Sequence, residues 1–329
     1  MEIVCPAGTP ASLRAAVKAG AHTIYCGFAD ETNARNFPGL NFDRDEMREG
    51  VTFAHAHGAK VLVAINTFPR AGSEPLWHRA VADAESCGAD AVILADAGLL
   101  AYAAQNHPDL RRHLSVQAAA ANADMINFYA AEFGIKRVVL PRVLSVPEIA
   151  AINAETEVET EVFVFGGLCV MAEGRCSLSS FATGLSPNMN GVCSPASHVE
   201  YRDKDGVLDA ELGGYTIHRV GRDEPAPYPT LCKGCFSASD GSDGKTGHLF
   251  EDPVSLNAEH LMPQLQKAGV TALKIEGRQR SRSYVAQVVR NFRAAVDALD
   301  AGRPLPEGML ARLSEGQAMT TGAYKKTWR

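Results

Sequence analysis

The feature that most constrains the fold of this chain is a regular alternation of short apolar runs with helical patterns. The apolar runs, rich in aliphatic and β-branched residues, cover residues 2–5, 23–27, 60–66, 91–95, 113–117, 137–140 and 161–165. Helical patterns lie between them, at 12–20, 43–57, 76–87, 98–106, 124–133 and 146–154. The apolar runs are mostly continuous rather than alternating, which is typical of a parallel sheet covered by helices.

An eighth strand is predicted at 271–275, and a helix follows it from about 281 to 300. This order predicts a TIM-like (β/α)8 barrel with a cysteine-rich insertion between strands 7 and 8. The first seven βα units are assigned to residues 1–168, the insertion to 169–262, and the last βα unit with the tail to 263–329. Residues 183–253 are rich in Gly, Ser, Pro and Asp, and we expect them to be irregular. A doubly wound open sheet is the alternative, but no G-x-G-x-x-G sequence opens the first helix.

Charge and hydropathy limit the partners of the chain. The 32 Lys and Arg residues against 38 Asp and Glu residues give a net charge of −6, so we expect no nucleic-acid partner. The most apolar stretch, 89–104, contains Asp90 and Asp96, and no leader sequence opens the chain, so we expect no transmembrane segment. These features predict a cytoplasmic protein, whose cysteines are kept reduced.

Polar residues follow several of the predicted strands. In a barrel of this kind the chemistry lies at the carboxyl ends of the strands. These ends carry Asn66, Gln117, Arg142, Glu276 and Arg278. Strand ends are also polar simply because they meet water, but a set with two arginines favours a site for an anionic substrate, since arginine matches carboxylates.

The cysteines carry the strongest chemical signal. Five of the eight lie in and around the insertion: Cys169, Cys176, Cys193, Cys232 and Cys235. Bound metal would stabilise an insertion that is too small to hold a large core of its own. The irregular spacing is compatible with an iron–sulfur cluster, the C-x2-C pair at 232–235 with zinc, and free thiols are the third possibility. No H-E-x-x-H or G-x-S-x-G sequence indicates a histidine-bound metal or a serine nucleophile.

The segment 161–179 resembles the signature of the collagenase-like peptidase family of unknown catalytic type. The matching residues are Glu161, Phe163, Gly166, Leu168, Cys169, Gly174, Cys176 and Ser179. Within that family the chain resembles the ubiquinone-biosynthesis branch, the UbiU-like proteins, along nearly its whole length. The similar stretches are 5–8, 32–35, 64–67, 93–96, 116–117, 138–145, 193–196, 228–234, 274–281, 314–316 and 322–324.

The resemblance implies a four-iron–four-sulfur (4Fe-4S) cluster bound by Cys169, Cys176, Cys193 and Cys232, with Cys235 outside the set. It implies a heterodimer with a homologous, UbiV-like subunit, and oxygen-independent hydroxylation of the aromatic ring of ubiquinone precursors. Relatives in the family hydroxylate RNA bases, with prephenate implicated as the oxygen source.

From this we expect catalytic roles for Arg142, Glu276 and Arg278. Arg142 and Arg278 are candidates to hold a carboxylate-rich donor such as prephenate, and Asn66, Gln117 and Glu276 to orient it. The alternatives are an RNA-base hydroxylase and a non-catalytic electron-transfer or scaffold subunit. Peptidase activity is not expected, because no nucleophile–base pair is visible in the sequence.

Overall fold

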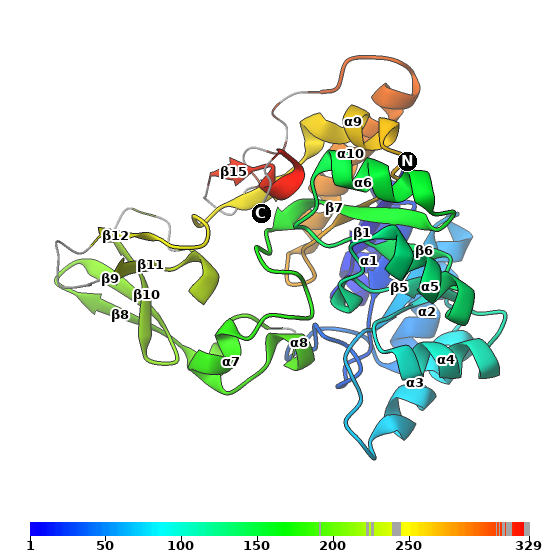
Figure 1. Ribbon diagram of the computed structural model, residues 1–329, viewed down its shortest axis with the longest axis horizontal. Coiled ribbons are helices and arrows are strands. Elements are labelled where there is room, and N and C mark those ends of the chain that lie inside the picture. Colours follow the sequence, from blue (N-terminus) through cyan, green and yellow to red (C-terminus); the bar gives the residue numbers. More distant parts are fainter. Residues whose placement is uncertain are drawn as a thin grey trace.

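The computed structural model describes residues 1–190, 192–221, 224, 227–238, 245–306, 308, 310, 313 and 318–325. In this part of the chain, eight parallel strands form a closed barrel (Figure 1). They are β1 (Glu2–Pro6), β2 (Thr23–Cys26), β3 (Lys60–Ile65), β4 (Ala91–Leu94), β5 (Arg111–Leu114), β6 (Arg137–Val139), β7 (Glu159–Gly167) and β14 (Ala272–Ile275). The last strand, β14, pairs with both β7 and β1, which closes the ring. The predicted barrel is therefore confirmed, and the open sheet is excluded.

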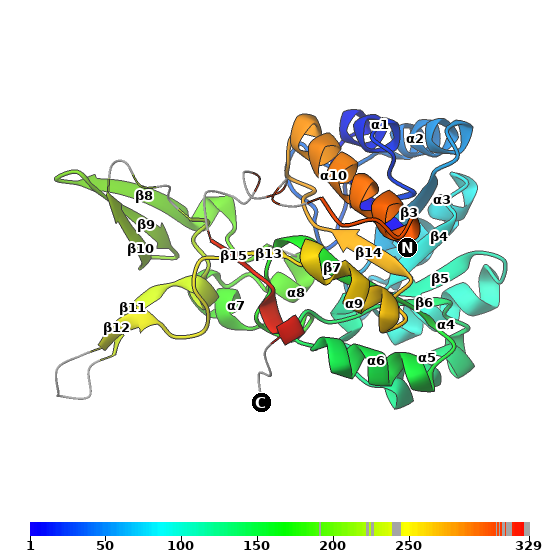
Figure 2. The same ribbon diagram turned by 90° about the horizontal axis from the view of Figure 1, so that it is seen from above.

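Helices cover the outside of the barrel (Figure 2). They are α1 (Pro10–Lys18), α2 (Arg44–Ala56), α3 (Glu74–Ser86), α4 (Ala97–Asn106), α5 (Ala123–Phe133), α6 (Val146–Glu155), α9 (Met262–Lys267) and α10 (Arg282–Asp300). Local sequence sets their ends: Asp43 and Ser145 form capping boxes at the starts of α2 and α6, and Gly134, with φ 63°, ends α5. No helix in the described part of the chain is both long and apolar enough to cross a membrane.

The strand predicted at 113–117 is displaced, because β5 ends at Leu114. The reason is Ser115, whose Oγ accepts a hydrogen bond of 3.2 Å from the backbone N–H of Gln117 and so starts a 3₁₀ turn at Val116–Ala118. Gln117 therefore lies on a turn above the barrel rather than on a strand.

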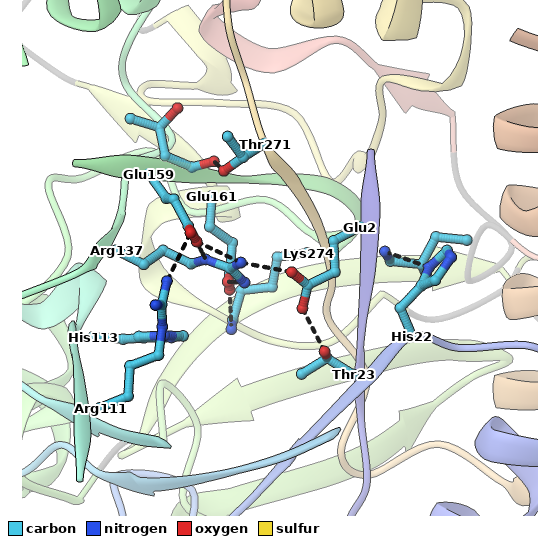
Figure 3. A network of polar contacts seen from close by, with 12 residues as sticks. Glu2, His22, Thr23, Arg111, His113, Arg137, Glu159, Glu161, Thr271 and Lys274 are labelled. Carbon is cyan, nitrogen blue, oxygen red and sulfur yellow. Dashed lines mark hydrogen bonds and ion pairs between the residues drawn. The ribbon is translucent and has the colours of Figure 1, made fainter. Parts of the chain in front are cut away.

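The interior of the barrel is only partly apolar. Its apolar part consists of Val4, Tyr25, Leu62, Ala64, Ala91, Ile93 and Ala272. The rest is a network of ion pairs at the amino ends of the strands (Figure 3). Glu161, which is fully buried, lies 2.5 Å from Lys274 Nζ and 3.4 Å from Arg137, and Arg137 also pairs with Glu2 at 2.6 Å. This network connects residues near the starts of β1, β6 and β7 with Lys274 of β14.

The insertion follows β7 and stands to one side of the barrel (Figure 1). It contains α7 (Leu178–Thr183), α8 (Pro187–Asn190), a three-stranded antiparallel sheet of β8 (Val199–Lys204), β9 (Val207–Leu212) and β10 (Tyr215–Gly221), and a hairpin of β11 (Cys235–Ala238) and β12 (Lys245–His248). Beyond it, β13 (Ser255–Asn257) pairs antiparallel to the end of β7, and β15 (Met319–Thr320) pairs with β13.

The expectation that residues 183–253 are irregular is wrong. Two hairpin turns explain the difference: Asp205 and Gly206 join β8 to β9, and Gly213 and Gly214 join β9 to β10, all four with positive φ. Asp-Gly and Gly-Gly are the residue pairs that two-residue hairpins prefer, so this glycine-rich composition encodes turns. The sequence match at 314–316 lies outside the described residues.

Candidate functional site

A cavity of about 460 Å³ opens at the carboxyl ends of the barrel strands, between the barrel and the insertion. All five strand-end residues predicted from the sequence line it: Asn66, Gln117, Arg142, Glu276 and Arg278. The structure also adds Arg35, Glu173 and Lys274 to its polar lining and Tyr25, Phe37, Phe163, Tyr201 and Tyr228 to its aromatic lining. The rule that chemistry lies at these strand ends therefore brings the predicted residues to one place.

Arg142 joins three segments at the edge of this cavity. Its Nε donates to Glu173 Oε1 at 2.7 Å, and its Nη1 donates to Glu276 Oε2 at 2.8 Å and to the backbone carbonyl of Gly167. Its guanidinium also lies 4.0 Å from the centre of the Phe163 ring. Burial acts to lower the pKa of Arg142, but the carboxylates of Glu276 and Glu173 outweigh burial and raise it. Arg142 is thus a permanent cation that is already hydrogen-bonded within the protein.

Glu276 lies between two arginines. Besides its contact with Arg142, its Oε1 is 3.8 Å from Arg35 Nη2. Burial acts to raise the pKa of Glu276, but the charges of Arg142 and Arg35 outweigh burial and lower it, so the carboxylate is ionised. A Cβ on Gly167 would come within 2.7 Å of Glu276 Oε2, so a larger residue at position 167 would displace this carboxylate.

Arg278 is the buried arginine of the cavity whose hydrogen bonding is incomplete. Its Nη1 donates to Asn33 Oδ1 at 2.6 Å, whereas its buried Nε has no partner among the described residues. Burial lowers the pKa of Arg278, whose hydrogen-bond acceptor is an amide oxygen rather than a carboxylate. Such a guanidinium, 8% exposed and facing a cavity, can receive an anionic ligand.

The two predicted amide side chains, Asn66 and Gln117, differ in their hydrogen bonding. Asn66 Oδ1 accepts a hydrogen bond of 3.0 Å from the backbone N–H of Ala34 and so holds the loop that carries Arg35. Gln117 is 8% exposed, and its buried Oε1 has no partner in the described part of the chain. Gln117 is therefore the amide whose side chain remains available for hydrogen bonding to a ligand.

The cysteine-bearing segments are tied to one another beside the cavity. Asn188 bridges to the backbone of Cys176, donating from Nδ2 to its carbonyl at 2.8 Å. Ser179 Oγ donates to the carbonyl of Cys193 at 2.7 Å. Gly167 and Glu173, which flank Cys169, form part of the cavity wall.

Burial raises the pKa of two of the predicted ligand thiols, Cys193 and Cys169. Burial raises the pKa of Cys193 to about 11, against the lowering effect of Arg35, and the thiols of Cys232 and Cys176 add to the increase. Burial also raises the pKa of Cys169. Glu173 and, to a smaller extent, Cys193 add to this increase, whereas the charge of Arg142 opposes it. The pKa of each of these two thiols therefore reflects burial first and neighbouring charges second.

Cys235 differs from this group, because its side chain is exposed at the start of the hairpin β11–β12. All eight cysteines are free thiols in the structure. As the side chains stand, no group of three or more His, Cys, Asp or Glu residues within the described ranges is close enough together to hold a metal ion.

Among the lining residues that sequence reasoning did not assign to this site are Glu173, Tyr201 and Tyr228. Glu173 carried a signal, since it lies inside the C-x6-C loop, where an acidic residue can pair with a strand-end arginine. Tyr228 opens the family-like stretch 228–234, whereas Tyr201 carried no signal, because its approach to the cavity depends on how the insertion folds.

Comparison with known proteins places this site in a family. A model described as Peptidase family U32 matches residues 8–322. The chain belongs to this family. The collagenase-like peptidase resemblance seen in the sequence is therefore confirmed.

Several relatives are named for hydroxylation of RNA. The chain is 34% identical to tRNA hydroxylation protein P of Escherichia coli (strain K12), over 96% of this chain and 72% of the relative. It is 30% identical to the 23S rRNA 5-hydroxycytidine C2501 synthase of the same organism, over 96% of this chain and 42% of the relative. It is 26% identical to a collagenase of Porphyromonas gingivalis (strain ATCC BAA-308 / W83), over 90% of this chain and 66% of that protein.

Among solved structures, the U32 peptidase Mk0906 matches half of this chain and 69% of its own, with a TM-score of 0.43 and 20% sequence identity. The comparisons confirm the family, while the ubiquinone-biosynthesis branch within it stays a prediction.

Proposed function

We propose that this protein is an oxygen-independent hydroxylase of an aromatic ring, and that it binds a four-iron–four-sulfur cluster through Cys169, Cys176, Cys193 and Cys232. One observation carries the proposal. The loop that contains Cys169 also lines the cavity, through Gly167 and Glu173. A redox group on those thiols would lie beside whatever the cavity binds.

The donor set fits such a cluster in kind. A cluster of this type needs four thiolates, and the family resemblance implies four cysteines, Cys169, Cys176, Cys193 and Cys232. Cations accompany three of them, since Arg142 acts on Cys169, Arg35 on Cys193 and Lys233 on Cys232, in each case lowering the thiol pKa against the effect of burial. When bound, the cluster would supply electron transfer at the edge of the cavity.

The side chains of the cavity would bind the ligand and hold one another in position. Arg278 is placed to donate to a carboxylate, and Gln117 Oε1 is placed to accept a hydrogen bond from a polar group on the same ligand. Arg142, which the sequence also assigned to the anion, is better supported as a positioning residue, because its donors already contact Glu173, Glu276 and Gly167. Glu276 stays ionised between Arg142 and Arg35, and it holds Arg35 beside the cavity.

Two rings compete as the substrate. An RNA base is favoured by the names of the relatives, which hydroxylate tRNA and rRNA. The ring of a ubiquinone precursor is the second candidate, favoured by the sequence resemblance and by the net charge of −6, since phosphate binding calls for basic surface. In the second case, a homologous UbiV-like subunit is the proposed partner.

The cluster is tested by measuring iron and acid-labile sulfide per chain, with an absorption spectrum, on protein purified without oxygen. About four of each are expected. Cys193→Ser should lose most of the iron, and Cys235→Ser, the matched control on the exposed hairpin, should keep it. Colourless protein with about one zinc would refute the cluster.

The substrate is tested in anaerobically grown cells of the organism that encodes the chain. Wild type and Cys193→Ser are compared by mass spectrometry of their quinones and of their digested RNA. Loss of a hydroxylated nucleoside identifies an RNA base, and accumulation of an under-hydroxylated quinone precursor identifies the second ring. If neither changes, the hydroxylase proposal is wrong.

A further inference from the structure

Two tyrosines of the insertion line the cavity and leave much of their rings exposed. Tyr201 lies on β8 and is 52% exposed, and Tyr228 precedes the 3₁₀ turn Leu231–Lys233 and is 46% exposed. Within the described residues, neither ring stacks on another ring or lies under a cation. Large aromatic side chains usually bury most of their area. Two half-exposed rings at one cavity therefore indicate a surface that a bound ligand would cover.

Two of the three aromatic rings on the barrel side of the cavity, Tyr25 and Phe163, already lie under a cation; the third is Phe37. Lys274 Nζ lies 3.8 Å from the centre of the Tyr25 ring, and the Arg142 guanidinium lies 4.0 Å from that of Phe163. Cations thus occupy ring faces of Tyr25 and Phe163. A flat ligand that enters the cavity therefore finds rings without a cation at Phe37 and at the two tyrosines of the insertion.

Tyr228 is held in place without using its ring. Its hydroxyl donates to the backbone carbonyl of Ser194 at 3.0 Å, and Ser194 Oγ donates in turn to the carbonyl of Pro229. Ser194 directly follows Cys193, so these bonds fix the ring next to a cysteine-bearing segment. A ring that is already immobilised loses little conformational entropy when a ligand stacks on it.

We propose that Tyr201 and Tyr228 bind the substrate by stacking on its ring, and that they restrict the cavity to aromatic ligands. The inference rests on the proposed function for the location of the site, and it adds the residues that select the substrate. The shared chemistry is a planar ring, which a quinone precursor and an RNA base both supply. Loss of one base–aromatic stack typically weakens binding by roughly 5- to 150-fold.

The test uses the purified full-length chain and two probes, benzoate and cyclohexanecarboxylate. Both carry one carboxylate, which suits Arg278, and they have similar size, but only benzoate is aromatic. The ratio of their dissociation constants, measured by ligand-observed NMR, isolates the contribution of the ring. Wild type should prefer benzoate by at least about fivefold.

The variants separate stacking from other effects. Tyr201→Leu and Tyr228→Leu should bring the ratio toward one, whereas Tyr228→Phe, which keeps the ring, should preserve it. Tyr215→Leu is the matched control, because Tyr215 is 46% exposed on the same insertion and lies 5.9 Å from Phe181 rather than at the cavity. Cytidine, titrated into the same set, shows which source of the ring the site prefers.

The outcomes are distinguishable from those of the proposed function. If wild type shows no ring preference, or if both leucine variants keep it while circular dichroism confirms their fold, the stacking role is wrong. If Tyr228→Phe loses the preference as fully as Tyr228→Leu, the hydroxyl rather than the ring is responsible, and the assignment of Tyr228 is overturned. A preserved ring preference together with unchanged hydroxylation products in cells would refute the hydroxylase but support the stacking site.

Discussion

Replacing Arg142 with alanine removes the side chain that holds the first cysteine loop against the barrel. The guanidinium of Arg142 is 4% exposed and joins Glu173, inside the loop, to Glu276, at the end of β14. After the substitution, the buried Glu173 carboxylate, 8% exposed, loses its guanidinium partner and keeps, among the described residues, only the contact of 3.4 Å with the backbone N–H of position 142. The loop between Cys169 and Cys176 should then lose its anchor.

The magnitude follows from the burial of each partner. Breaking a buried ion pair by removing one partner costs about 3–5 kcal/mol, because the other charge stays unpaired. Glu276 contributes less to this loss, since it is 26% exposed and keeps Arg35 at 3.8 Å. We therefore expect Arg142→Ala to lower the free energy of unfolding by about 3–5 kcal/mol, most of it from Glu173. Adding Glu173→Gln should recover at least about 1 kcal/mol, because it removes the orphaned charge.

Two measurements on metal-free protein check this prediction. Urea unfolding gives the change in stability, with Arg202→Ala as the control, because Arg202 is 53% exposed and its ion pairs should contribute at most about 1 kcal/mol. Alkylation followed by mass spectrometry gives the accessibility of Cys169, with the exposed Cys235 as the internal reference. Cys169 should react faster, relative to Cys235, in Arg142→Ala.

A small effect would refute this reasoning. If Arg142→Ala unfolds within about 0.5 kcal/mol of wild type, and if Cys169 is alkylated at the wild-type relative rate, Arg142 does not position the loop. The role in binding an anionic substrate, which the sequence assigned to Arg142, would then be the better explanation.

Three further predictions concern the barrel and the cysteine loop. Glu161→Gln should lower the unfolding free energy by about 3–5 kcal/mol in urea, because it leaves the buried Lys274 without its carboxylate partner, whereas Arg137 keeps Glu2; an unchanged midpoint would contradict this. Burial acts to raise the pKa of Glu2, but Arg137 outweighs burial and lowers it below the ordinary value of 4.5. The stability due to Glu2 is therefore complete above that value and is lost as the pH falls through the lower folded pKa, so Glu2→Gln should flatten the acid side of the stability profile. Gly174→Ala should reduce iron retention while the barrel stays folded by circular dichroism, because a Cβ there would come within 2.0 Å of the Gln117 carbonyl, at a φ of +80°; full retention would show that the loop moves freely.

The barrel could be predicted because its signals are local and repeated. Continuous apolar runs, glycine helix ends and their order along the chain are enough to define eight strands, and the carboxyl ends of these strands define the cavity. Arg142 and Gln117 could therefore be assigned to the cavity from the amino-acid sequence alone, although the contacts of Arg142 could not. A sequence shows that an arginine follows a strand, but the partner, Glu173, depends on the path of a loop.

The insertion was the part that sequence reasoning misjudged. Its turn pairs at 205–206 and 213–214 were visible, but the apolar residues between them are too few for a clear strand pattern, and β8 is exposed on nearly every residue. Tyr201 lies on this strand. Its place at the cavity is set by the packing of the insertion on the barrel, which no short-range pattern records.

The position of Cys235 bears on the choice between the two metals. Spacing made Cys232 and Cys235 a candidate zinc knuckle, which would place both thiols on one ion. The structure separates their surroundings: Cys232 packs against the main hydrophobic core and contacts Thr230, while Cys235 is exposed and opposite His248 in the hairpin. Without Cys235, the remaining cysteines come from the end of β7 and from distant parts of the insertion, so a group bound to all four would link the insertion to the barrel. Because metal binding of that kind contributes directly to folding, the insertion should lose its order when the iron is removed, whereas the barrel, held by its own core and ion pairs, should not.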